Sequence, residues 1–203
     1  MKRFMLLGLA LGVVLLALPV VAVELLPEYC HASNIFNCLG QATVLGTPVT
    51  FNMSGGDALA MVETFESASK SRSVTWSNFQ MNGVTKDGAE MTASLDQSRK
   101  SSGTLFSIGN GKFPATATMR FFLRLETGGM TMVSTEPAVF QGVVRSIPPA
   151  PGDSLALISG PVRFHEEGGN SSATVATLNK SRVVYHKPGV TPPDVERGDR
   201  VQR

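Results

Sequence analysis

His165, Glu166 and Glu167 are three neighbouring residues whose side chains bind divalent cations. Imidazole suits zinc and carboxylate oxygens suit calcium, provided that several ligands converge on one ion. Successive residues of a strand point to opposite faces, so the two glutamates converge only where a strand ends. Gly168 and Gly169 follow directly and indicate such an end. These three residues are weak candidates for a surface metal contact, and the sequence predicts no dedicated metal site and no cofactor.

The chain has two cysteines, Cys30 and Cys38. The seven residues between them fit neither a Cys-x-x-Cys redox motif nor a zinc knuckle. In an exported chain, two cysteines this close together are most simply paired. We therefore predict a disulfide between Cys30 and Cys38, which would stabilise the N-terminal segment by about 2.5 kcal/mol through the short loop that it closes.

The residues Gly152-Asp153-Ser154-Leu155 resemble the four-residue signature of a large family of serine esterases and lipases. The resemblance implies a nucleophile at Ser154, near the start of an α/β domain, and a downstream Asp-x-x-His that supplies the base. Only 49 residues follow Ser154, and they contain no Asp-x-x-His. Because the motif lacks this context, we interpret it as a turn that leads into a strand.

The N-terminus has the layout of a secretory signal peptide. Lys2 and Arg3 precede an apolar run over residues 4–18, and small residues follow up to Ala22. This order of a basic start, an apolar stretch and a small-residue cleavage site is typical of export leaders. We predict that residues 1–22 are removed, that the mature chain starts at Val23, and that it is secreted or periplasmic.

An uncleaved leader is the alternative. Counted on through Leu26, and interrupted by Glu24, the apolar run approaches the roughly 20 residues that span a bilayer. In that case the protein would be anchored in a membrane by its N-terminal segment. With cleavage, no stable membrane span remains.

Charge excludes one class of partner. The chain has 18 basic and 16 acidic residues, and loss of Lys2 and Arg3 with the leader leaves 16 of each. A neutral mature chain has no net charge with which to attract nucleic acid. We expect no nucleic-acid partner, whereas a protein or carbohydrate partner stays open.

Short segments with alternating apolar and polar residues recur from Gln41 onward. Residues 89–95 and 118–126 each place apolar side chains at every second position. Asp87-Gly88 and Gly128-Gly129 are dipeptides that favour tight hairpin turns. This pattern predicts an all-β fold, specifically an antiparallel β-sandwich, with a flattened β-barrel as the alternative.

We divide the chain into four parts. The leader covers residues 1–22, an N-terminal segment with the local disulfide covers 23–40, the β-sandwich domain covers 41–187, and a disordered tail covers 188–203. Trp76, the single tryptophan, is expected to anchor the core rather than to bind a sugar.

The residues favour a non-catalytic role, because no nucleophile, base and metal ligands converge in the sequence. We expect a secreted or periplasmic protein with a binding, adhesion or structural function. The alternative is a secreted hydrolase that acts on a polysaccharide or an ester, with a site assembled from residues distant in sequence.

Overall fold

The computed structural model describes residues 28–33, 36–54, 56–63, 70–109, 113–170 and 172–186. These residues form an antiparallel all-β fold without helices, as the sequence pattern predicts. In this described part of the chain no helix is long and apolar enough to cross a bilayer. The predicted leader at 1–22 and the predicted tail at 188–203 lie outside the described residues.

Fourteen strands make one hydrogen-bonded sheet among the described residues. The first seven are β1 (Glu28–Ser33), β2 (Phe36–Val44), β3 (Thr47–Ser54), β4 (Asp57–Val62), β5 (Ser71–Thr85), β6 (Glu90–Leu95) and β7 (Ser102–Ser107). The other seven are β8 (Ala115–Phe121), β9 (Leu123–Thr127), β10 (Met130–Ser134), β11 (Ala138–Val144), β12 (Ser154–Leu157), β13 (Val162–Glu166) and β14 (Ala176–Tyr185).

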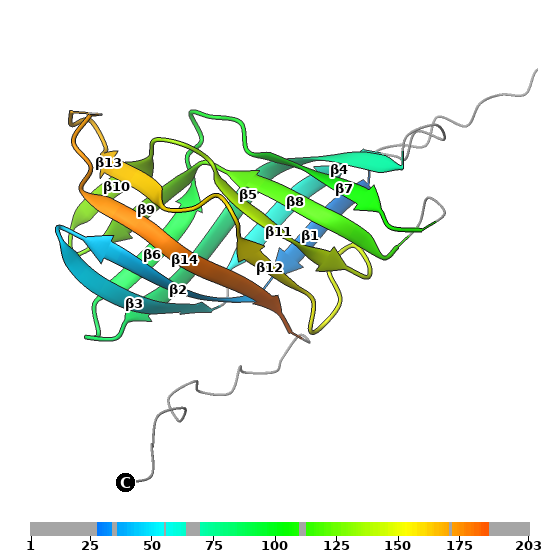
Figure 1. Cartoon of the computed structure of the whole chain (residues 1–203), viewed down its shortest axis with the longest axis horizontal. Helices are drawn as coiled ribbons and strands as arrows, with labels where there is room; N and C mark the ends of the chain where they lie inside the picture. The colour runs from blue at the N-terminus through cyan, green and yellow to red at the C-terminus, as the bar shows by residue number, and fades with distance from the viewer. Residues whose placement is uncertain are drawn as a thin grey trace, which may run out of the picture.

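The strand pairings close into a ring. Beginning at β5, the antiparallel neighbours are β6, β9, β10, β13, β14, β2 and β3, and β3 pairs with β5 again. Farther along the two long strands, β7, β8, β11 and β12 also connect β5 to β14, and β4 and β1 extend from β5 (Figure 1). The two layers expected of a sandwich are therefore joined at their edges, an arrangement consistent with the predicted β-sandwich and with its alternative, the flattened barrel.

A bulge in β5 decides which of its residues face the core. The register with β4 shifts by one residue between Leu59 and Ala60, so that Ser77 is the extra residue. Its hydroxyl donates a hydrogen bond to the carbonyl of Leu59 (3.1 Å). In a regular strand, residues three positions apart face opposite sides. Because the bulge reverses the alternation, Trp76 and Phe79 nevertheless both pack against the core. Trp76 is thus partly buried and packs against the core.

The alternation predicted for two segments is confirmed. Met91, Ala93 and Leu95 of β6 are buried, and so are Leu123 and Leu125 of β9. These residues face a single apolar core that also receives side chains from the other strands of the ring.

The predicted turns are also formed. Gly88 adopts a φ of 88° between β5 and β6, and Gly128 and Gly129 adopt 57° and 76° between β9 and β10. Two consecutive residues with positive φ match the right-handed twist of a two-residue hairpin.

The N-terminal strands correct two expectations. The described residues of the segment 23–40 form β1 and the start of β2, inside the sheet rather than before it. Cys30 lies on β1 beside β4, whereas Cys38 lies on β2 between β14 and β3. No disulfide joins them. The predicted Cys30–Cys38 disulfide is thus absent, because the two cysteines belong to strands that pair with different partners.

Candidate functional site

The closed ring of eight strands surrounds an apolar cavity of ≈ 40 Å³, which we call the ring cavity. Each of the eight strands contributes at least one lining residue, and β8 and β11 add one each. One water molecule needs roughly 10–15 Å³ of such space. The ring cavity therefore has room for a small molecule, and its lining is almost wholly apolar.

Four methionines share the lining of the ring cavity and come from four strands. Met53 of β3 faces Gly83 of β5 in the register, and Gly83 in turn faces Met91 of β6. Met81 and Met132 are 1% and 0% exposed. Methionine has three rotatable bonds and a polarisable sulfur, so it adapts to the shape of an apolar partner. The wall that these residues form is deformable.

Aromatic rings bound the ring cavity on one side. Phe79 stacks on Phe121 with ring centroids 5.2 Å apart, and Phe140 lies 5.9 Å from Phe121. Trp76 meets Phe121 edge-on at 5.2 Å. The three phenylalanines line the ring cavity, whereas Trp76 lines a second, separate cavity. The aromatic group thus divides the interior into two spaces.

The ring cavity contains one hydrogen-bonded polar pair. The Sγ atom of Cys38 lies 3.0 Å from the Oγ atom of Ser181, and both residues are buried. Burial raises the pKa of the Cys38 thiol to about 11, and the hydrogen bond with Ser181 only partly opposes this. The thiol is consequently protonated at neutral pH. It offers weak hydrogen bonding to a guest molecule and no nucleophile.

The three weak metal candidates have other surroundings. The Glu167 carboxylate accepts a hydrogen bond from Arg124 (3.0 Å). His165 lies on β13 opposite Val133 of β10, and Glu166 is exposed at the end of β13. Among the residues that the structure describes, no group of three His, Cys, Asp or Glu side chains is placed to hold a metal ion.

The carboxylate of Asp153 anchors the loop between β11 and β12. It accepts hydrogen bonds from the backbone N–H of Arg145 (2.9 Å), from Nε of Arg145 (2.6 Å) and from the backbone N–H of Ala150 (2.8 Å). Its side chain is 3% exposed. Asp153 therefore ties together the two ends of this proline-rich loop, which agrees with the turn interpretation of the motif.

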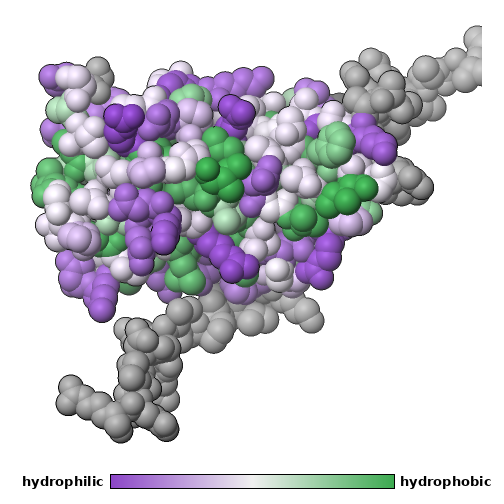
Figure 2. All heavy atoms as spheres, viewed as in Figure 1, coloured by the Kyte–Doolittle hydropathy of each residue, from purple (hydrophilic) through white to green (hydrophobic). Residues whose placement is uncertain are grey.

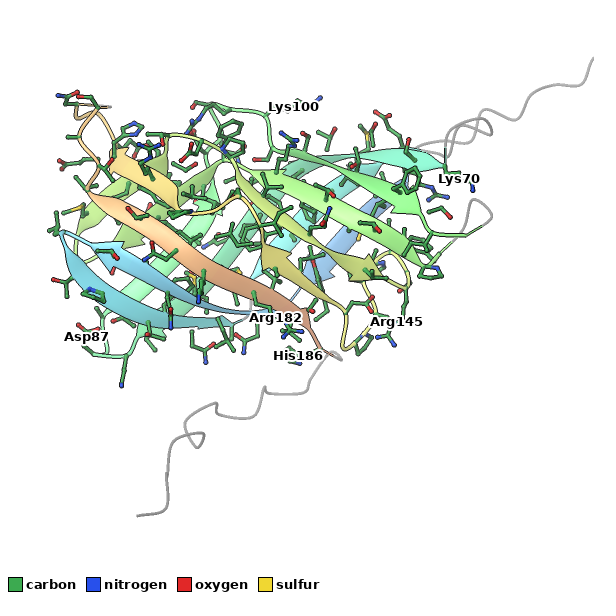
Figure 3. All side chains as sticks on the ribbon, in the orientation of Figure 1. Lys70, Asp87, Lys100, Arg145, Arg182 and His186 are labelled. Carbon is green, nitrogen blue, oxygen red and sulfur yellow. The ribbon has the colours of Figure 1, made fainter. Side chains whose placement is uncertain are left out.

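Ser154 is placed unlike an activated nucleophile. Its hydroxyl accepts a hydrogen bond from the guanidinium of Arg182 (2.9 Å), on the neighbouring strand β14. Arg182 and His186 both lie toward the end of this strand (Figure 3). Within the described part of the chain, no hydrogen bond joins Ser154 to His186. A serine nucleophile needs a base that accepts its proton, and a guanidinium has no acceptor.

The outer surface differs from the ring cavity. Over the face in Figure 2, hydrophilic residues lie between hydrophobic ones. Phe106 and Val143 are 54% and 49% exposed, and both face Thr116 in the register of β7, β8 and β11. Single exposed apolar side chains of this kind are normal on soluble proteins. The continuous apolar lining of the interior is the more specific feature.

Comparison with known proteins supports the fold. No family model matches the chain, and no curated protein matches it at a significant level. A solved structure of DynF, from the dynemicin biosynthesis pathway of Micromonospora chersina, is similar with a TM-score of 0.62 and 19% sequence identity. The similarity covers 81% of this chain and 84% of DynF. At this level of identity the likeness concerns the fold alone.

Sequence reasoning did not identify the residues of the ring cavity as a group. Nine methionines in the chain were a compositional signal, and the alternation placed Met53 and Met91 on buried faces. The pairing of β2 with β14, which brings Cys38 beside Ser181, joins residues 143 positions apart. Only the closed ring shows that these side chains border one space.

Proposed function

We propose that this chain is an exported, non-catalytic binding protein that holds a small apolar molecule inside its ring of β-strands. The observation that supports this proposal is the ring cavity, which is enclosed by eight strands and lined by four adaptable methionines. Ligand sites in proteins are typically concave and apolar, with a few polar groups that set orientation.

The chemistry of the lining favours a neutral guest. No Lys, Arg, Asp, Glu or His side chain is among the residues that line the ring cavity. Transfer of an unpaired charge into such surroundings is strongly unfavourable. A small uncharged hydrocarbon-like molecule fits these conditions without a counter-charge. A ring the size of benzene also requires the methionine side chains to move apart, because a cavity that holds benzene is typically about 150 Å³.

A binding role accords better than hydrolysis with the groups near the interior. The Cys38 thiol is protonated, and the Ser154 hydroxyl is bonded to Arg182 rather than to a base.

Export rests on the N-terminal pattern alone, with its basic start and apolar run. Release of the protein from cells with the leader, and its retention without residues 1–22, would test that part of the proposal.

Thermal unfolding in the presence of benzene tests the binding function. A ligand that binds only the folded state stabilises it by mass action. At ten times its dissociation constant, benzene should raise Tm by about 3 to 6 °C for a chain of this length. A Tm that does not depend on benzene concentration would contradict the proposal.

Two variants of strand β6 separate binding in the ring cavity from weak surface effects. Ala93 lines the ring cavity, so Ala93→Leu should fill part of it and remove most of the benzene-dependent shift. Thr92 points to the outside, where its hydroxyl bonds the Asn82 side chain (3.1 Å), so Thr92→Leu should leave the shift unchanged. Equal shifts in both variants would place benzene elsewhere.

A further inference from the structure

A second apolar cavity, of ≈ 30 Å³, lies beneath the loop between β11 and β12. We call it the loop cavity. It shares no lining residue with the ring cavity. Ile147 and Pro149 of the loop border it, together with Trp76, Met119 and Tyr185 from β5, β8 and β14. It is thus a separate space with a composition of its own.

Trp76 borders the loop cavity, and its indole N–H is a hydrogen-bond donor. Its Nε1 atom is buried, and none of the described residues accepts a hydrogen bond from it. A buried donor without an acceptor costs about 1–3 kcal/mol. The neighbouring Phe121, which meets the indole edge-on, offers no acceptor atom. An acceptor that enters the loop cavity would recover this cost.

The electrostatics of the loop cavity favour a neutral acceptor over an anion. Burial, with smaller contributions from Cys30 and Asp153, raises the pKa of the Tyr185 phenol, so that this group carries no charge. No Lys, Arg or His side chain is among the residues that border the loop cavity. An anion inside it would therefore lack a counter-charge in apolar surroundings, which is strongly unfavourable.

We propose that the loop cavity is a second binding site, which takes a small neutral molecule through a hydrogen bond from Trp76 Nε1 to a carbonyl oxygen of that molecule. The remaining lining packs against its hydrocarbon part. This site shares no lining residue with the ring cavity, and so it goes beyond the proposed apolar-binding function.

Acetone and 2-methylpropene are suitable probes, because they are small, have nearly the same shape and differ in a carbonyl oxygen. Trp76 is the only tryptophan, so its indole N–H gives a single NMR signal in the whole protein. We expect acetone to shift this signal downfield in a saturable manner. It should also bind about three- to tenfold more tightly than the hydrocarbon.

The methyl group of Met119 reports on the loop cavity in variants that lack the indole. Trp76→Phe keeps an aromatic ring and removes the donor, so both probes should then bind with equal affinity. Ser181→Ala changes only the ring cavity and should keep the preference for the ketone. The proposal is overturned by equal affinities in the unaltered protein, by absence of binding, or by a preference that persists in Trp76→Phe. The indole signal of the unaltered protein decides the question even where Trp76→Phe does not fold.

Discussion

The thiol of Cys38 and the hydroxyl of Ser181 lie 3.0 Å apart inside the ring cavity, on the paired strands β2 and β14. Ser181 faces Gly40 in the register, so no side chain of β2 stands directly opposite the hydroxyl. Cys38 is the next residue along β2 on the same face. This contact places a hydrogen-bonded side-chain pair of the ring cavity at the seam between the N-terminal and C-terminal strands.

Because Cys38 is buried, we predict that its thiol reacts slowly with alkylating reagents. Its pKa rises from 9.0 to about 11, which lowers the thiolate fraction at neutral pH by about a hundredfold. In a Cys30→Ser variant, alkylation of Cys38 by iodoacetamide should be at least about a hundredfold slower in the folded protein than in urea. Equal rates in the two states would show that the thiol is accessible and ionised.

The same two thiols test the correction to the predicted disulfide. Cys30 and Cys38 are on strands with different partners and are not joined. Mass spectrometry of protein that is unfolded and alkylated without reductant should find two labelled cysteines per chain. A mass without labels would indicate that the disulfide forms.

Substitutions of the neighbouring residues Asp153 and Ser154 should have unequal effects on the stability of the protein. Asp153→Ala removes a buried acceptor of three hydrogen bonds, so the free energy of unfolding should fall by about 2–3 kcal/mol. Ser154→Ala removes one contact with Arg182 and should change it by less than about 0.5 kcal/mol. Urea titrations measure both. A larger loss for Ser154→Ala would refute the anchoring role of Asp153.

We predict that protonation of the Asp96 carboxyl lowers the stability of the protein in acid. Burial opposes ionisation of its carboxyl, but hydrogen bonds from Ser98 and Arg99 outweigh this and lower the pKa below 3.8. Because the pKa is lower in the folded state, this contribution is fully present above about pH 4 and is lost as the pH falls through the folded value.

The Asp96→Asn variant isolates that contribution. It removes the charged hydrogen bonds and should lower the free energy of unfolding by about 1–3 kcal/mol at pH 7. The difference between this variant and the unaltered protein should shrink between pH 5 and pH 2. A difference that is constant over this range would mean that Asp96 does not titrate as inferred.

Alanine substitutions at two glycines test how closely the backbones of β3 and β5 approach each other. Gly83 lies against a neighbouring strand, and Gly109 borders open space. A Cβ atom on Gly83 would lie 2.1 Å from the carbonyl oxygen of Asn52 and 2.5 Å from Cα of Met53, so Gly83→Ala should cost at least about 2 kcal/mol of stability. A Cβ atom on Gly109 meets nothing within 4 Å, so Gly109→Ala is the matched control with little effect. Similar unfolding midpoints for both variants would contradict the packing of β3 against β5.

The sequence predicted the secondary structure of the core strands well, and the assembly of the strands poorly. Alternation over 89–95 and the turn at Gly128-Gly129 are local signals, because side-chain direction and φ depend on neighbouring residues. The start of the sheet was missed because residues 36–44, from Phe36 to Val44, contain Asn, Cys and Gly without regular alternation.

The ring cavity could not be predicted from local sequence patterns. The ring closes through β14 and β2, whose residues are far apart in the chain, and one sequence does not record which strands become neighbours. The bulge at Ser77, which turns both Trp76 and Phe79 toward the core, was equally hidden. The cavities and their lining follow from these two long-range features.

An NMR titration with methyl-labelled methionine tests the central claim most directly. Met53, Met81, Met91 and Met132 line the ring cavity, Met119 lines the loop cavity, and Met61 lines neither. The account predicts that benzene shifts the four ring-cavity methyl signals with one common dissociation constant and leaves Met61 unchanged. Absence of saturable shifts in those four signals, or equal shifts in all methionines, would contradict a ligand site inside the ring.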